Sequence, residues 1–268
     1  MLRNLSKLNG FAIRAEDGKA GTLEQFYFDD ESWTVRYLVV NAGDWLTGRQ
    51  VLVSPIAVRQ LEWESKRLDV ALTKKRIEDS PPIDTHKPVS RQHEAAYFGY
   101  YGYPYYWGGP MLWGLASYPG GLTLDQEPVT DPGLLRTRAE KESPDSHLRS
   151  TDEVTGYHIQ ASDGEIGHVK NFLVDDDTWG IRYLEVDTRN WLPGKKVLLS
   201  PQWITKVGWP ESKVYVDLTR ATIKNAPEWN ESDTITREYE NRLYDYYDRS
   251  PYWTPGTEQN QPRSAGKS

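Results

Sequence analysis

The stretch that decides the fold is residues 33–40, WTVRYLVV, because it occurs a second time at 179–186 as WGIRYLEV. The two copies lie 146 residues apart, and residues 156–227 repeat residues 10–81 at this offset without a gap. A repeat of this length indicates a duplicated structural unit rather than a catalytic motif. Each copy is therefore expected to fold in the same way.

Each copy is predicted to contain five or six short strands separated by Gly, Asp and Pro turns. Asp17-Gly18, which returns as Asp163-Gly164, supplies the positive φ that a tight hairpin turn requires. The run over 22–29 alternates except at Leu23, which predicts a β-bulge near Glu24-Gln25. With no long helix inside the copy, the pattern favours a small β-barrel, and the chain is predicted to be all-β with short helices and two such barrels in tandem.

The strand over 35–40 is the strongest in each copy, and comparison of the copies assigns its faces. Position 39 is Val, but its counterpart at 185 is Glu, so that face is expected to meet water. Leu38 and Val40 lie on the opposite face and are expected to point into the core, since successive strand residues alternate between faces.

Arg36 and Arg182 begin this strand on the side that is expected to face inward. A buried guanidinium without a partner is costly. We therefore predict that each pairs with a carboxylate at the rim of its barrel, Arg36 with Asp29 and Arg182 with Asp175.

The repeat continues beyond each barrel into a short amphipathic helix and an aromatic arm. Ser90 and Thr236 are expected N-caps, and positions 93, 97, 100 and 101 are predicted to share one helix face. The arms either form a contact surface for a partner protein or membrane interface, where Tyr and Trp are favoured, or pack on the chain's own barrels. Their recurrence favours packing on the chain itself, in cis or across to the other barrel. The candidate interaction residues are Tyr100, Tyr101, Tyr105, Tyr106, Trp107, Tyr246, Tyr247, Tyr252 and Trp253.

These patterns divide the chain into six segments. They are a first barrel (1–82), a helix with an aromatic arm (83–108), a flexible linker (109–147), a second barrel (148–228), a second helix and arm (229–254), and a disordered tail (255–268).

Composition excludes several classes of function. The net charge of -7 and the pI near 5.4 argue against nucleic-acid binding, which normally needs a basic surface. The chain contains no cysteine, so disulfides, cysteine–zinc sites and thiol catalysis are ruled out. No stretch approaches the roughly 20 apolar residues of a membrane-spanning helix. We expect a cytoplasmic protein, with peripheral contact at the inner face of the membrane as an alternative.

No catalytic or metal constellation stands out. Asp175-Asp176-Asp177 is a carboxylate cluster, but consecutive Asp residues between strands more often form a turn. The five histidines show no metal-ligand spacing. Ser54 and Ser200 precede proline and are expected to bond locally to the backbone. The prediction is no catalytic residue, no metal and no cofactor.

The order strand, Asp-Gly, strand, Asp-Asp, strand, Ser-Pro resembles the PRC-barrel family. The residues that carry the resemblance are Gly18, Gly21, Asp29-Asp30, residues 36–40 (RYLVV) and residues 51–55 (VLVSP), with their counterparts 146 later. That family includes the cytoplasmic barrel of the photosynthetic reaction-centre H subunit and the C-terminal domain of a ribosome-maturation factor. The membrane-spanning helix of the H subunit and the aromatic arms are the two points at which chain and family differ.

The resemblance implies a non-enzymatic module that docks onto other proteins. Its role would be in photosynthesis or electron transfer in a photosynthetic host, and in envelope or stress physiology elsewhere. The alternative is a small-molecule or metal-binding protein with a site between the two barrels. The expected partners are one or more proteins of unknown identity, and the expected assembly is a homodimer or an intramolecular pseudo-dimer of barrels.

Overall fold

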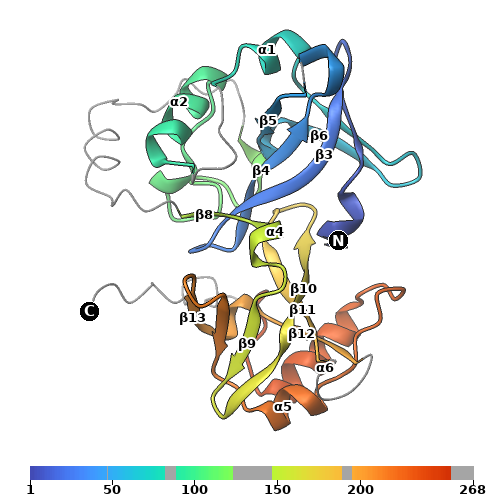
Figure 1. Ribbon diagram of the computed structural model, residues 1–268, viewed down its shortest axis with the longest axis vertical. Helices are drawn as coiled ribbons and strands as arrows, with labels where there is room; N and C mark the ends of the chain where they lie inside the picture. The colour runs from blue at the N-terminus through green and yellow to red at the C-terminus, as the bar shows by residue number, and fades with distance from the viewer. Residues whose placement is uncertain (47, 82–88, 123–146, 189–194, 255–268) are drawn as a thin grey trace.

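The computed structural model describes residues 1–46, 48–81, 89–122, 147–188 and 195–254. It is built mostly of β-sheet with a few short helices, and its strands form two sheets of seven strands each (Figure 1). We call residues 10–107 the first unit and residues 156–253 the second unit. Each unit contributes six strands to one sheet.

The elements of the two units correspond one to one. The first unit has β2 (Ala12–Ala15), β3 (Gly18–Asp29), β4 (Thr34–Asn41), β5 (Gln50–Val53), β6 (Val58–Glu62), β7 (Arg67–Val70), α1 (Lys74–Glu78) and α2 (Arg91–Tyr101). The second has β9 (His158–Ala161), β10 (Gly164–Asp175), β11 (Ile181–Asp187), β12 (Lys196–Leu199), β13 (Ile204–Gly208), β14 (Lys213–Val216), α5 (Arg220–Asn225) and α6 (Arg237–Tyr247).

Neither sheet closes, so the expected closed barrels are not seen. The strand order is β5-β4-β3-β2-β7-β6 in the first unit and β12-β11-β10-β9-β14-β13 in the second. Side chains and loops occupy the outer edge instead. Tyr97 of α2 donates its hydroxyl to the carbonyl of Leu52 (3.2 Å) and accepts from the N–H of Ser54 (3.0 Å). In the second unit the N–H of Trp229 donates to the carbonyl of Lys196 (2.8 Å). Covered edges of this kind cannot pair with a further strand.

The seventh strand of each sheet comes from the other repeat. β1 (Leu2–Asn4) pairs antiparallel with β10 of the second unit, and β8 (Leu148–Ser150) pairs antiparallel with β3 of the first (Figure 1). The registers are equivalent, because Leu2 faces Asp175 just as Leu148 faces Asp29. The two repeats therefore exchange strands reciprocally, as the subunits of a strand-swapped dimer do.

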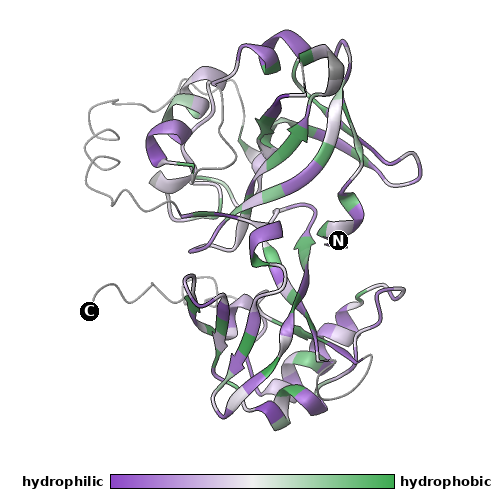
Figure 2. Ribbon diagram, viewed as in Figure 1, coloured by the Kyte–Doolittle hydropathy of each residue, from purple (hydrophilic) through white to green (hydrophobic). Residues whose placement is uncertain are grey.

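The exchanged segments explain why one prediction about the central strand is wrong. Val39 and Glu185 were expected to meet water, but both are fully buried. The short helices that follow the exchanged strands, η1 (Leu5–Leu8) and α4 (Thr151–Val154), pack on β10 and β3. Glu185 lies 3.0 Å from the ammonium of Lys196 and accepts a 3.5 Å hydrogen bond from Asn4. Apolar residues accordingly concentrate in the strands (Figure 2).

Several local predictions are confirmed. The pairing of β3 with β4 shifts register between Leu23 and Gln25, which is the expected bulge. The side chains of Ser90 and Thr236 cap α2 and α6 by accepting from backbone N–H groups three residues on. Ser54 and Ser200 likewise bond to the backbone two residues on.

The predicted helix face and the predicted linker need correction. The buried residues of α2 are Glu94, Tyr97, Phe98 and Tyr101, so the predicted face is shifted by about one position. Residues 109–122, expected to be flexible, are packed: Trp113 is fully buried, and η5 (Pro119–Gly121) contacts η3 (Pro55–Ala57). The rest of the predicted linker, 123–146, and the predicted tail lie outside the described residues. No helix in the described part of the chain is long and apolar enough to span a membrane.

Candidate functional site: the seam between the units

The two units meet at the residues with which each copy of the central strand begins. The N–H of Val35 donates to the carbonyl of Trp179 (2.9 Å), and the N–H of Ile181 donates to the carbonyl of Trp33 (2.7 Å). These two bonds are related by the 146-residue offset and flank a bridge between Thr34 and Gly180. A pseudo-two-fold axis therefore passes through this contact. We call the contact between the two units, centred on residues 33–35 and 179–181, the seam.

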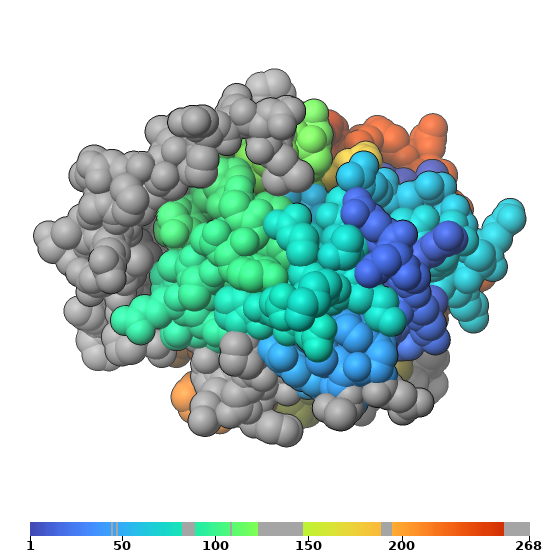
Figure 3. All heavy atoms as spheres, turned by 90° about the horizontal axis from the view of Figure 1, so that it is seen from above, coloured from blue at the N-terminus to red at the C-terminus, as the bar shows by residue number. Residues whose placement is uncertain are grey.

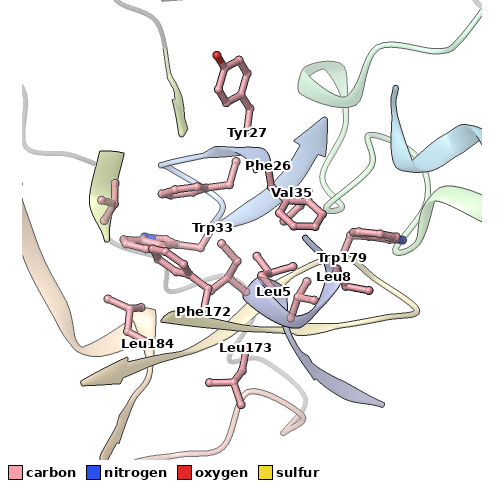
Figure 4. Close-up of a cluster of buried hydrophobic side chains, with 14 of the residues drawn as sticks. Leu5, Leu8, Phe26, Tyr27, Trp33, Val35, Phe172, Leu173, Trp179 and Leu184 are labelled. Carbon is pink, nitrogen blue, oxygen red and sulfur yellow. The ribbon is translucent and has the colours of Figure 1, made fainter. Parts of the chain in front are cut away.

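Two of the five non-glycine residues with positive φ in the described part of the chain lie at this axis. Trp33 and Trp179 have φ of 49° and 60°, a left-handed conformation that costs a bulky residue about 1–3 kcal/mol. This conformation is stabilised because the carbonyl of each tryptophan accepts a backbone hydrogen bond from the other unit. Below it, Phe26 packs against Trp179 and Phe28 against Phe172, with ring centroids 6.4 and 5.7 Å apart. Figure 4 shows Phe26, Phe172 and Trp179 converging from both units, with Leu5 and Leu8 of η1 among them.

Each exchanged strand carries an arginine that clamps the seam. Arg3 of β1 donates from Nε to Asp176 of the second unit (2.9 Å), and its guanidinium lies 4.8 Å from the ring centroid of Trp63 in the first. The equivalent Arg149 bonds to Asp30 (3.0 Å) and lies 4.1 Å from the ring of Trp209. Sequence reasoning missed both arginines, although their 146-residue spacing was a visible signal.

Arg36 is the most buried cation at the seam. It lies 3.7 Å from Asp29, as the sequence predicts, and it also donates to Ser32 Oγ (2.9 Å) and to the carbonyl of Leu112 (2.5 Å). The rings of Tyr106 and Trp113 cover it at 3.8 and 4.9 Å.

Trp113 reaches the other unit. Its indole N–H donates to the carbonyl of Thr178 (2.8 Å), in the turn before β11. The segment 109–122 is therefore tied to both units, to the first through Arg36 and to the second through Thr178.

The prediction for Arg182 is wrong. Arg182 donates to Thr178 Oγ1 (3.2 Å) and lies 4.3 Å from the ring of Tyr252, and in the described part of the chain no ion pair joins it to Asp175. Asp175 instead accepts from the N–H groups of Asp177 and Thr178 and so stabilises the turn.

The aromatic arms pack on their own units. Of the nine candidate interaction residues, Tyr101, Tyr106, Tyr247 and Tyr252 are buried, and Tyr105, Trp107 and Trp253 are half-buried. Tyr100 and Tyr246 remain exposed, and the hydroxyl of Tyr100 bonds to the carbonyl of Arg76 in α1 (2.9 Å). Seen from the end of the first unit, α1 and α2 lie side by side on the surface (Figure 3).

A buried glutamate anchors each arm. Glu94 accepts from the hydroxyls of Tyr37 (3.2 Å) and Tyr106 (2.6 Å) and pairs with Arg91 (3.0 Å). Glu240 has the same set of partners, Tyr183, Tyr252 and Arg237. Burial raises the pKa of Glu94 to about 7, against the opposing effect of Arg91. The phenolic pKa values of Tyr37 and Tyr106 are raised by burial, so both donate to Glu94 as neutral hydroxyls.

The acidic turn of the second unit is engaged by cations of the chain itself. The carboxylates of Asp175, Asp176 and Asp177 lie within 4.8 Å of one another, the closest approach to a metal cluster among the described residues. Asp176 pairs with Arg3 and with the ammonium of Met1. This geometry is that of a turn pinned to β1.

An exposed apolar patch lies on the segment 109–122, which contains no charged residue. Leu115, Tyr118 and Met111 have exposed fractions of 70, 52 and 49%. They project from a base that is held by the buried Trp113 and by reciprocal backbone bonds between Met111 and Gly114 (3.0 and 3.1 Å). Gly114 has φ of 79°, and a Cβ there would lie 2.7 Å from a backbone oxygen of the arm, so the turn needs glycine. We call Met111, Leu115 and Tyr118 the 111–118 patch.

The seam also contains a cavity of about 220 Å³. It is lined by Arg3 and Lys7 from the N-terminal segment, by Trp63 of the first unit and by residues 229 and 231–235 of the second. Lys7 bonds to the carbonyl of Glu231 (2.8 Å) across one side of it.

No family model matches the chain, and no curated protein matches it in sequence. The resemblance to PRC-barrels therefore rests on the residues quoted above.

Proposed function

We propose that this chain is a non-catalytic docking protein of the tandem PRC-barrel type, in which the two repeats form one platform for a protein partner. The observation that carries the proposal is the 111–118 patch. Apolar side chains as exposed as Leu115 and Tyr118, on a base as fixed as that around Trp113, are typical of interaction sites. The fixed base favours binding, because little conformational entropy is then lost when the segment 109–122 contacts a partner.

The chemistry of the patch favours a protein over a membrane. The segment 109–122 has no Lys or Arg, so it lacks the basic residues that attract anionic lipid. An exposed Tyr, Leu and Met on one short segment suit the apolar centre of a protein interface. The seven aromatic-arm residues that are buried or half-buried support this function indirectly, because they pack on the units and so hold the arms in place.

The proposal is tested by photo-crosslinking in cells of the organism that encodes the chain. Benzoylphenylalanine at position 115 should crosslink one defined partner, whereas the same group at the exposed Gln60 of β6 should not. Adding Tyr118→Glu should remove the crosslink, because a charge cannot enter an apolar pocket unpaired. With the purified partner, Leu115→Glu should weaken binding by about 10–100-fold, the value of one buried leucine. Equal crosslinking at 115 and 60 would count against docking, and crosslinking of the chain only to itself would replace the partner with a second copy.

The second candidate function is small-molecule binding between the units, and the 220 Å³ cavity favours it. Pockets at such junctions are common binding sites. A compound that raises the Tm of the full chain, and loses this effect when Trp63 is changed to Ala, would favour this function. An equal loss in Trp209→Ala, at the equivalent position outside the cavity, would contradict it.

A further inference from the structure

The two exchanged segments bind in the same register but make different polar contacts. Residues 2–8 (LRNLSKL) lie on the edge of β10, and residues 148–154 (LRSTDEV) lie on the equivalent edge of β3. Both begin with Leu-Arg, and Arg3 and Arg149 bind the two acidic turns in the same way. Selectivity between the two edges must therefore come from the residues that follow the arginine.

On the edge of β10 the contacts are made by an asparagine amide. Asn4 Oδ1 accepts from Asn171 Nδ2 (2.5 Å), and Asn4 Nδ2 donates to Glu185 (3.5 Å). Asn4, Asn171 and Glu185 are all buried, and the carboxylate of Glu185 also lies 3.0 Å from the ammonium of Lys196. A buried carboxylate needs such donors, because an ion without partners in the interior is costly.

On the edge of β3 the contact is made by a threonine hydroxyl. Thr151 Oγ1 accepts from the backbone N–H of the buried Phe26 (3.3 Å). In the second unit the equivalent N–H, that of Phe172, donates to the side chain of Asn171 (2.8 Å). The position of Asn171 is occupied in the first unit by Gln25, whose longer side chain bonds to β8 instead. The first unit thus obtains the acceptor for this N–H from the exchanged segment.

The segment that contains β8 does not fit the edge of β10. It would bring Ser150 to the position of Asn4. A serine side chain is too short to reach Glu185, because the longer Asn4 reaches it only at 3.5 Å. The buried carboxylate would lose a donor, and an unsatisfied buried charge costs more than the hydrogen bond alone contributes.

The segment that contains β1 does not fit the edge of β3. It would place Leu5 at the position of Thr151. Leucine offers no acceptor, so the N–H of Phe26 would be buried without this partner. The amide of Asn4 would meet Val39, which is fully buried and apolar, in place of a carboxylate.

We propose that each of these sheet edges is a selective binding site for one exchanged segment, β10 for the segment that contains β1 and β3 for the segment that contains β8. Selectivity arises because the wrong segment leaves a buried polar group unpaired, namely the carboxylate of Glu185 on β10 and the N–H of Phe26 on β3. Exchange is then favoured between unlike units and disfavoured between like units, both within one chain and between two copies. This inference concerns the assembly of the chain and is independent of the docking function proposed above.

Two backbone amides report the binding of each segment separately. The N–H of Asp176 donates to the carbonyl of Met1 (3.0 Å), and the N–H of Asp30 donates to the carbonyl of His147 (2.9 Å). Amide hydrogen exchange of the full chain, followed by NMR, therefore measures the opening of β1 at Asp176 and the opening of β8 at Asp30. A change that destabilises the whole chain speeds exchange at both amides, whereas release of one segment speeds exchange at one of them.

The test on β10 converts the segment and the edge into those of the first unit, first separately and then together. The segment and edge substitutions are Asn4→Ser with Leu5→Thr, and Asn171→Gln with Glu185→Val. Each pair alone should speed exchange at Asp176 about tenfold or more, the effect of about one buried hydrogen bond, and leave Asp30 within about threefold. With both pairs together, exchange at Asp176 should be slower than in either variant alone, because the new threonine can then accept from the N–H of Phe172.

A milder pair of variants tests β3 and decides the question if the buried substitutions on β10 prevent folding. Thr151→Val removes only the hydroxyl that accepts from Phe26 and should speed exchange at Asp30 about tenfold. Adding Gln25→Asn should restore most of the protection, because an asparagine there can bond to the N–H of Phe26 as Asn171 does in the second unit.

The proposal is overturned if the combined β10 variant exchanges at Asp176 as fast as the product of its two separate effects. It is also overturned by equal acceleration at Asp176 and Asp30 in any one variant, or if Gln25→Asn fails to slow exchange in the Thr151→Val chain. Recovery of protection in the combined variants supports selective edges, because only matched segments and edges satisfy the buried groups.

Discussion

Arg36 and Arg182 occupy equivalent positions in different surroundings, so the same substitution should have very different costs. The change to be compared is Arg→Met at each position, which keeps a flexible, unbranched stem, shortens the side chain and removes the charge. At position 36 it leaves the carboxylate of Asp29 buried without a cation and removes the donor to the carbonyl of Leu112. At position 182 it removes one hydrogen bond and one contact with a ring.

The magnitudes follow from these contacts. Breaking a buried ion pair by removing one partner costs about 3–5 kcal/mol. The loss at the half-buried Arg182 is one hydrogen bond and one partly exposed cation–π contact, about 1 kcal/mol together. We therefore expect Arg36→Met to destabilise the chain by at least about 2 kcal/mol more than Arg182→Met.

The assay is urea denaturation of the full chain at pH 7, with intrinsic fluorescence and circular dichroism as two probes of the same transition. Asp29→Asn supplies the coupling term: in the double variant with Arg36→Met, the loss should be smaller than the sum of the single losses, because the orphaned charge is gone. Equal destabilisation by the two methionine variants would refute the reasoning, as would strict additivity with Asp29→Asn.

Three further predictions concern the buried glutamate, a close backbone approach and the exchanged strands. Burial raises the pKa of Glu94 from its ordinary 4.5 to about 7, so the protonated form is favoured in the fold. The free energy of unfolding should fall by about 3 kcal/mol as pH rises from 4.5 to 7, and urea titrations across this range should show a flatter slope for Glu94→Gln. Gly21→Ala should lower stability by about 3 kcal/mol in thermal unfolding, because a Cβ there would lie 2.3 Å from a backbone oxygen of β4, whereas Gly10→Ala, in open space, should cost about 1 kcal/mol. Cleavage at a protease site inserted between residues 123 and 146 should leave two fragments that co-elute on size exclusion, since β1 and β8 each belong to the other unit's sheet; separate elution would contradict the exchange.

Local features of this fold were accessible from the sequence because each depends on neighbouring residues. The Asp-Gly turns, the bulge at Leu23 and the caps at Ser90 and Thr236 are set by backbone conformation within a few positions. Because the repeats are offset by 146 residues, each prediction made for the first unit applied to the equivalent position of the second.

The exchange of strands was not accessible, because it pairs residues that are distant in the chain. Nothing local in residues 2–4 indicates β10 as their partner, and the error about the face of Val39 follows directly from this gap. Glu94 was missed as a buried anchor because a glutamate on a helix normally indicates solvent. Its recurrence as Glu240 was the one available signal. Trp113 was assigned to a linker because the repeat has no counterpart for it.

The exchanged strands also constrain the order in which the chain can fold during synthesis. β3 is complete at Asp29, yet its outer partner is not made until Leu148–Ser150, and β1 waits for Leu173–Asp175. At roughly 5–20 residues per second, the N-terminal strand spends of the order of ten seconds or more before its pairing site exists. Through that interval the unpaired edge of β3 is open to the β1 or β8 of a neighbouring nascent chain. Correct assembly therefore requires pairing within one chain to be faster than pairing between chains. The length of the segment that joins the two repeats sets the effective concentration of the intramolecular strand.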